Sequence, residues 1–149
     1  VALLNGVCRR TPAARAAVLA RAEEIAAGGG SIEAPLARWF DEGQQAIRAQ
    51  VAGWLSAVDP QGYAAAYRAF AEGDAVYADR IGQVRCPLLV LTADGDANST
   101  PGMTQAIAAM APLGRAVVIE GHRHMVNLTA PERVSAELRT WLDARETVL

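Results

Sequence analysis

Residues 86–101 read Cys86-Pro87-Leu88-Leu89-Val90-Leu91-Thr92-Ala93-Asp94-Gly95-Asp96-Ala97-Asn98-Ser99-Thr100-Pro101, an apolar run that ends in acidic residues. Positions 88–91 show no alternation of polar and apolar side chains, which is typical of a strand covered on both faces, as in a parallel sheet packed by helices. A carboxylate at the carboxyl end of such a strand lies where open α/β sheets build their sites. The stretch therefore predicts an α/β fold with a candidate site at its acidic end.

The rest of the chain predicts helices and two further strands around this run. We expect a buried strand at residues 1–5, four helical segments between residues 11 and 73, and a brief helical return at residues 74–83. Beyond the central run we expect a helix from Thr100-Pro101, a strand at residues 116–119 and a last helix that begins with a capping box of Thr129 and Glu132. Five aromatic residues of the helical segments are expected to face the core: Trp39, Phe40, Trp54, Tyr63 and Tyr67.

Three mostly parallel, buried strands do not make a self-sufficient sheet, because parallel sheets need cover on both faces and paired edges. The chain also opens directly on the strand-like run Val1-Ala2-Leu3-Leu4. We therefore expect further strands, supplied by a companion polypeptide or by an N-terminal half.

Composition excludes several classes of partner. The net charge of −2 and the pI near 5.7 give no electrostatic basis for binding nucleic acid or an anionic membrane surface. No apolar run approaches the roughly 20 residues of a membrane span. The two cysteines, Cys8 and Cys86, form no metal or disulfide pattern, so we expect a cytoplasmic protein.

Asp96 and His124 are the candidate catalytic residues. A histidine that acts as a general base needs its proton held on one nitrogen, and a buried carboxylate does this. The loop after residue 91 and the loop at residues 120–128 follow neighbouring strands joined by one helix, and a right-handed crossover brings both loops to one sheet edge. Asp94 is the alternative acid, although Asp94-Gly95 is typical of a turn.

Ordinary structural roles stay open for the same residues. Asp96 could be a capping or turn acid, and His124 could be a hydrogen-bonded loop histidine. For His122 we expect a solvent-facing or hydrogen-bonding role in the loop.

The segments 88–101 and 118–125, the latter reading Val118-Ile119-Glu120-Gly121-His122-Arg123-His124-Met125, resemble the last two core strands of the α/β-hydrolase fold. In that family the acid follows its strand in a pattern like Gly-x-x-Asp with a nearby proline. Asp96 takes the acid position here, and Ala93 stands where glycine is common. The family's histidine usually precedes a residue such as Met or Phe, which matches His124-Met125. Residues 11–80 look like the family's helical cap.

The resemblance implies a Ser-His-Asp hydrolase in which Asp96 orients His124. The family's nucleophile elbow, Gly-x-Ser-x-Gly, and its first oxyanion-hole loop are absent from this sequence. In the family's chain order both lie upstream, so the resemblance implies a serine on a companion segment. None of the four serines has the elbow's setting: Ser31, Ser56, Ser99 and Ser135.

Among subfamilies, the chain looks most like the 3-oxoadipate enol-lactonase and small-ester hydrolase group, through Arg38-Trp39-Phe40 and Gly62-Tyr63-Ala64-Ala65. The apolar character of the cap favours a small organic acyl substrate over a charged polymer. Five residues are expected to bind it, with Arg38 able to hold a carboxylate: Arg38, Trp39, Phe40, Tyr67 and Met125.

The sequence allows three other interpretations of the chemistry. Cys8 half-matches the elbow, as Gly6-Val7-Cys8-Arg9-Arg10, but Arg10 stands where a small residue is needed, and a packed thiol is the ordinary alternative. His122-x-His124 with Asp94 or Asp96 could hold a divalent ion, without a third histidine or a cysteine cluster to support it. Residues 94–98 mimic the start of a calcium loop but lack its later ligands. The prediction is therefore no metal and no cofactor.

Together these features predict the C-terminal part of an α/β-hydrolase sheet with a helical cap. We expect a core strand at residues 1–10, the cap at 11–80, and core strands and helices that carry the acid and histidine at 81–149. The expected function is hydrolysis of a small ester or lactone. Two alternatives stay open: a non-catalytic relative that binds a ligand, and a carbon–carbon bond hydrolase or cofactor-free haloperoxidase on the same scaffold.

Overall fold

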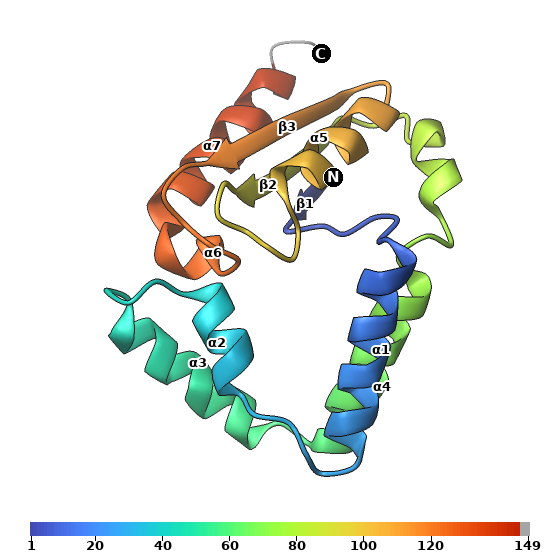
Figure 1. Ribbon diagram of the computed structural model, residues 1–149. Coiled ribbons are helices and arrows are strands. Elements are labelled where there is room, and N and C mark those ends of the chain that lie inside the picture. The colour runs from blue at the N-terminus through green and yellow to red at the C-terminus, as the bar shows by residue number, and fades with distance from the viewer. Residues whose placement is uncertain (147–149) are drawn as a thin grey trace.

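The computed structural model describes residues 1–146, so the last three residues of the predicted 81–149 segment lie outside the described residues. Figure 1 shows a sheet with its helices at the top and two pairs of helices below it. The sheet has the strand order β1-β2-β3, formed by Ala2–Leu4, Leu88–Ala93 and Gly114–Ile119. Both pairings are parallel, as predicted, with Leu3 opposite Val90 and Ala93 opposite Ile119.

The central strand β2 is buried along its whole length. Leu88 and Val90 pack on one face against helix α5, Pro101–Met110. Leu91 and Ala93 pack on the other face, where helix α7, Pro131–Glu146, covers the sheet. The unbroken apolar run therefore has the predicted cause, because successive side chains point to opposite faces and both faces are covered.

The expectation of a buried first strand is wrong for this chain. Val1 is 61% exposed and Leu3 37% exposed, and Ala2 is exposed as well. β1 pairs with β2 along one edge, and no strand among residues 1–146 pairs with its other edge. β3 is also exposed over its first half. Apolar composition shows which strands can be buried, but it does not supply the element that buries them.

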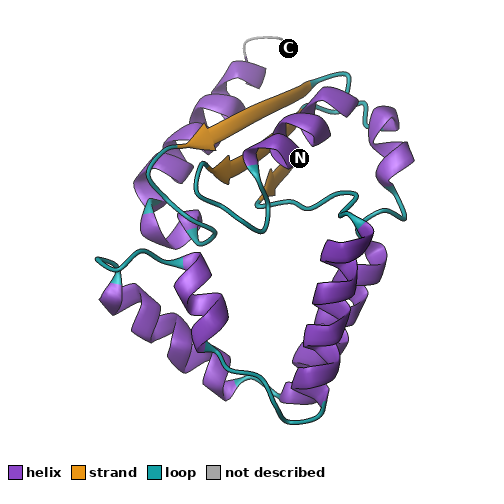
Figure 2. Ribbon diagram, in the orientation of Figure 1, coloured by secondary structure: helices purple, strands orange, loops and turns teal. Residues whose placement is uncertain are grey.

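Helices α1 to α4 lie between β1 and β2 in the sequence and form two antiparallel pairs (Figure 2). Helix α1, Pro12–Ala26, packs against α4, Pro60–Gly73, and α2, Glu33–Trp39, packs against α3, Gln45–Ala57. The predicted starts at Thr11 and Asp59 are confirmed, since each side chain accepts a backbone N–H of the first turn. A short 3₁₀ helix, Ala78–Gln83, follows. The α2–α3 pair has its own core, made by Leu36, Trp39, Phe40 and Val51.

Two local predictions need correction. Trp54 is 51% exposed, because it lies on the outer face of α3. Thr129 does not cap the last helix: it ends the short helix α6, Val126–Thr129, and α7 begins only at Pro131. Its hydroxyl lies 2.9 Å from Nδ1 of His122 instead. Within residues 1–146, no helix combines the length and apolar character that crossing a membrane requires.

Gly114 begins β3, directly after the tight turn that follows α5. A Cβ at Gly114 would lie 1.9 Å from the carbonyl oxygen of Ala108, whereas a Cβ at Gly53, inside α3, would meet nothing within 4 Å. Gly114→Ala should lower the free energy of unfolding by about 1–3 kcal/mol through overpacking. The matched variant Gly53→Ala should raise it by up to about 1 kcal/mol, since alanine loses less backbone entropy in a helix. Urea unfolding of both variants checks this, and equal stability of Gly114→Ala and the wild type would contradict the close approach.

Candidate active site

The loops that follow β2 and β3 are bound to each other at the carboxyl edge of the sheet. The N–H of Asp94 donates to the carbonyl of Ile119 at 3.0 Å, and the N–H of Gly95 donates to the carbonyl of His122 at 3.0 Å. A Cβ at Gly95 would lie 2.8 Å from that carbonyl oxygen, so glycine permits the approach. The predicted meeting of the two loops at one sheet edge is confirmed.

The structure brings Asp96 and His124 together. Nδ1 of His124 lies 2.9 Å from Oδ2 of Asp96, across 28 positions of sequence. The Asp96 side chain is fully buried, and the His124 side chain is 22% exposed. A buried carboxylate at this distance fixes the imidazole tautomer with its proton on Nδ1 and leaves Nε2 able to accept a proton.

Four other groups surround the Asp96 carboxylate. Oδ1 accepts the backbone N–H groups of Asn98 at 2.8 Å and Ser99 at 2.9 Å. Oδ2 accepts the side-chain amide of Asn5 at 2.8 Å and lies 3.1 Å from the hydroxyl of Thr92. That hydroxyl also lies 2.7 Å from the carbonyl oxygen of Ser99, so its single proton is shared between two acceptors.

These contacts set the ionisation of Asp96. Burial by itself raises the pKa of Asp96, but hydrogen bonds from His124, the Ser99 N–H and Asn5 outweigh it and lower the pKa from 3.8 to about 2. The carboxylate is therefore ionised at neutral pH, as a group that stabilises an imidazolium must be.

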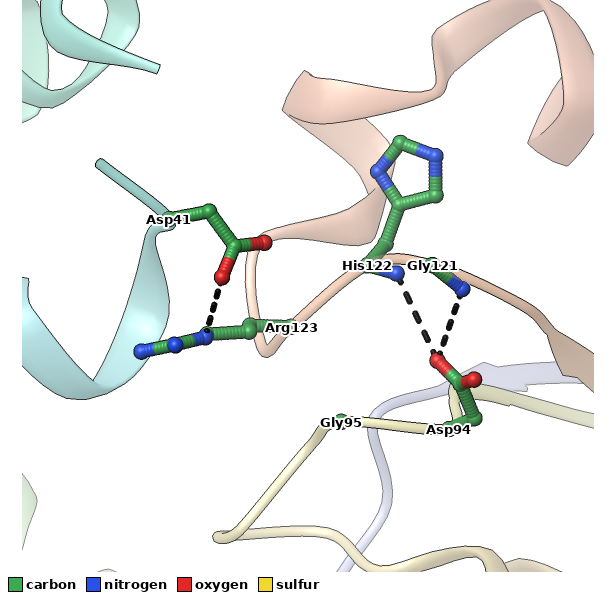
Figure 3. A pocket seen from close by; sticks show the side chains of 6 residues that line it. All are labelled: Asp41, Asp94, Gly95, Gly121, His122 and Arg123. Carbon is green, nitrogen blue, oxygen red and sulfur yellow. Dashed lines mark hydrogen bonds and ion pairs between the residues drawn. The ribbon is translucent and has the colours of Figure 1, made fainter. Parts of the chain in front are cut away.

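Asp94 and His122 have different partners. Oδ1 of Asp94 accepts the backbone N–H groups of Gly121 at 2.9 Å and His122 at 3.4 Å. Figure 3 shows these two bonds, with the imidazole of His122 pointing away from Asp94. His122 has the hydrogen-bonding role in the loop that was predicted for it, on Thr129. Of the two candidate acids, Asp96 therefore contacts His124, whereas Asp94 binds the backbone of the loop after β3.

The imidazole of His124 is held between the sheet edge and α2. Its ring centroid lies 5.7 Å from that of Trp39, with the planes tilted by 38°. The neighbouring Arg123 binds α2, where its Nη1 donates to the carbonyl of Ala37 at 2.8 Å. Its Nε also lies 2.7 Å from the carboxylate of Asp41, as Figure 3 shows. Within the part of the chain that the structure describes, no group hydrogen-bonds Nε2 of His124.

His124 lines an open-sided cavity of about 930 Å³ that is bordered by α1, α2, α4 and the loops after β2 and β3. Four of the five predicted substrate-binding residues line the same cavity: Arg38, Trp39, Tyr67 and Met125. Phe40 does not line this cavity. It is 2% exposed, because the chain turns at the end of α2 and buries this ring against α3.

The structure describes no nucleophile next to His124. Ser99 is buried and donates to the carbonyl of Asn5, and Ser56 donates to the carbonyl of Ala52 within α3. Ser31 and Ser135 are exposed on the surface.

Cys8 matches the alternative of a packed thiol. It lies against the apolar cluster beneath α5, and burial raises the pKa of its thiol. A raised pKa disfavours the thiolate that a cysteine nucleophile requires.

A metal centre has no support in the described residues. Among residues 1–146 the structure groups no three His, Cys, Asp or Glu side chains that could hold an ion. The imidazoles of His122 and His124 bond different partners, and the carboxylates of Asp94 and Asp96 accept backbone N–H groups rather than facing one point.

Asn5 and Thr92 are site residues that the sequence reasoning missed. Asn5 ends β1 in a left-handed conformation, with φ at 51°, which asparagine tolerates better than most residues. An asparagine directly after an apolar strand run was a usable signal, since the carboxyl ends of parallel strands meet at one edge. No comparable signal marks Thr92, because threonine is common inside buried strands.

Comparison with known proteins gives the family. The model of the alpha/beta hydrolase family matches residues 2–137. The (E)-2-((N-methylformamido)methylene)succinate hydrolase of Acinetobacter baylyi is 50% identical over 145 residues, which cover 96% of this chain and 55% of that protein. The chain thus spans about half the length of this relative.

Solved structures agree in fold. A thermophilic esterase from Thermogutta terrifontis, solved with malate bound, superposes with a TM-score of 0.82 at 27% identity, over 96% of this chain and 55% of the esterase. The enol-lactonase from Burkholderia xenovorans LB400 has a TM-score of 0.71 at 24% identity, over 96% of this chain and 54% of the lactonase. At that identity the lactonase shows a shared fold alone.

The ionised state of Asp96 can be tested through the pH dependence of stability. Because the folded pKa of about 2 lies below the ordinary 3.8, the carboxylate stabilises the fold above about pH 4, and this part is lost as the pH falls through 2. The difference between the two pKa values corresponds to about 2 kcal/mol in the free energy of unfolding. Asp96→Asn should be less stable than the wild type at pH 6, and the gap should narrow by that amount between pH 4 and pH 2. Urea unfolding at each pH measures it, and parallel loss of stability in both proteins would contradict the shift.

Proposed function

The chain belongs to the alpha/beta hydrolase family, and from this premise we propose that it carries the acid and the histidine of a hydrolase whose nucleophilic serine lies outside this sequence. The family match confirms the resemblance read from residues 88–101 and 118–125, and with it the fold class. The observation that carries the proposal is the 2.9 Å contact between Nδ1 of His124 and the buried Asp96 carboxylate, with His124 facing the large cavity.

The proposed reaction is acyl transfer to a serine and then to water. The serine hydroxyl attacks the substrate carbonyl while Nε2 of His124 takes its proton, and the imidazolium then gives that proton to the leaving group. Asp96 keeps the other proton on Nδ1 and stabilises the positive charge of the ring. Water repeats the sequence on the acyl-enzyme and frees the serine.

We propose that the serine arrives with further strands, from a companion polypeptide or an N-terminal half. The outer edge of β1 has no partner strand within residues 1–146, and its apolar side chains are exposed there. An apolar strand edge of this kind is a template for pairing with another strand. Because β1 runs parallel to β2, a strand that is added parallel to β1 has its carboxyl end at the same sheet edge as Asp96.

The substrate we propose is a small organic acid derivative with an ester, lactone or amide bond. The relative that is 50% identical to this chain is named for a succinate that bears a formamide group, and the structural neighbour at 27% identity is an esterase. The cavity has an apolar lining with arginines at its wall, which suits a small carboxylate-bearing molecule. Arg38, Trp39, Tyr67 and Met125 are the residues proposed to contact it.

A cytoplasmic location is part of the proposal. Both cysteines, Cys8 and Cys86, are free thiols in the structure. Free thiols are the ordinary state in a reducing compartment.

The two histidines of the β3 loop give a matched test in the assembled protein. His124→Ala should reduce the kcat/KM for a small ester such as p-nitrophenyl acetate by at least about 10³-fold, because the general base is lost. His122→Ala removes the neighbouring imidazole, which bonds Thr129 and not Asp96, and should keep most of the activity. Steady-state ester hydrolysis with both variants is the measurement.

The outcomes separate the proposal from its alternatives. Full activity of His124→Ala would end the proposed mechanism. Failure of a serine-directed phosphonate to label the assembled protein would favour a non-catalytic binding role. Labelling by the phosphonate without ester turnover would favour the alternative of a carbon–carbon bond hydrolase or a cofactor-free haloperoxidase.

A further inference from the structure

The wall of the large cavity carries more positive than negative charge. Three arginines line it, Arg10, Arg21 and Arg38, against one acidic residue, Glu24. Arg21 is neutralised locally, since its guanidinium lies 2.7 Å from Glu24 and also donates to the carbonyl of Ser31. The excess charge therefore belongs to Arg10 and Arg38.

Arg38 has no acidic partner among the described residues. Its one hydrogen bond runs to the side-chain oxygen of Asn98, at 3.3 Å. The backbone N–H of Asn98 in turn donates to Asp96, and Trp39, next to Arg38 on α2, contacts the His124 ring. Arg38 thus presents a guanidinium with unused donors beside the acid–histidine pair.

Arg10 is buried beside an acidic partner that it shares with a more exposed arginine. Its side chain is only 6% exposed, and it shares the carboxylate of Asp74 with Arg15: Nη1 of Arg10 lies 3.6 Å from Oδ2, and Nη2 of Arg15 lies 2.5 Å from Oδ1. Burial raises the pKa of Asp74, but the Arg10 N–H and Arg15 outweigh this and lower it, so the carboxylate is ionised. Arg15, whose side chain is 37% exposed, makes the close contact with Asp74, and the buried Arg10 has the longer one.

A buried guanidinium that reaches its carboxylate only at 3.6 Å is stabilised by a second anion in the cavity that it lines. The guanidinium of Arg10 also stacks 3.9 Å from the ring centroid of Phe70, a residue that lines the same cavity. The stacking holds the planar group in one orientation, which favours the paired hydrogen bonds that guanidinium makes with a carboxylate.

We propose that the cavity selects a substrate with two carboxylates, one held by Arg38 near the reacting bond and the other by Arg10 on the opposite wall. This rests on the proposed hydrolase function. Arg10 is then a specificity residue, and the Arg10–Asp74–Arg15 cluster is more than a clamp between α1 and α4. Arg15 also binds Asp74 but is not among the residues that line the cavity. If the cluster were only a structural clamp, substitution of Arg15 would therefore have the same effect as substitution of Arg10.

Inhibition of neutral-ester hydrolysis by simple acids tests this in the assembled protein. The probes are succinate, glutarate and adipate, each against the monoacid of the same carbon number. At least one diacid should inhibit at a concentration tenfold or more below its monoacid. Arg10→Gln and Arg38→Gln should each remove most of this preference, and Arg10→Lys and Arg38→Lys should restore part of it. Arg15→Gln should leave both the preference and the hydrolysis of the neutral ester unchanged.

The results separate the failure of this proposal from the failure of the proposed function. Neutral-ester turnover without any diacid preference would overturn the two-carboxylate site and leave the hydrolase function standing. Equal loss of preference in Arg10→Gln and Arg15→Gln would return the cluster to a structural role. If the assembled protein hydrolyses no ester, calorimetric titration with the same acids still decides whether the diacid site exists.

Discussion

The buried carboxylate of Asp96 joins the carboxyl ends of all three strands. It accepts the side-chain amide of Asn5 after β1, two backbone N–H groups from its own loop after β2, and Nδ1 of His124 after β3. An unpaired buried carboxylate would cost several kcal/mol, and each of these donors offsets part of that cost. The sheet edge is therefore held by the same group that orients the histidine, so its packing and its chemistry cannot be altered separately.

The loop that carries His124 also contacts α2. Arg123 binds the end of α2 and Asp41, and Trp39 lies against the ring of the adjacent His124. The histidine is thus positioned from two sides, by the sheet through Asp96 and by α2 through its ring face. A shift of α2 would move the imidazole as well as the cavity wall, which couples the shape of the cavity to the geometry of the acid–histidine pair.

The sequence was informative where one local pattern determines one local structure. The unbroken run of β2, the Thr-Pro helix starts, and the spacing of Asp96 and His124 were each sufficient for a correct structural expectation. It was not informative where the answer depends on a distant partner. The burial of β1 depends on what covers it, and the direction of Phe40 depends on how α2 meets α3. Thr129 belongs to the short helix α6, so it does not form the predicted capping box with Glu132 at the start of α7. Its hydroxyl contacts the imidazole of His122 instead.

The order of the chain divides the site between two parts of the fold. Because β1 and β2 are parallel neighbours, the chain leaves β1 at the carboxyl edge of the sheet, where Asp96 and His124 lie, and must return to the opposite edge before β2. Residues 6–87 make that return, and the helices they form stand over the edge that carries the acid and the histidine. The acid–histidine pair is fixed by strand ends and a shared carboxylate, whereas Arg10, Arg38 and the cavity's apolar lining on α1, α2 and α4 come from this connection. Under the proposed function, the helical connection carries the charge and shape that a substrate would meet, and the sheet edge carries the acid–histidine geometry. We therefore infer that specificity is determined in α1, α2 and α4 rather than in the sheet.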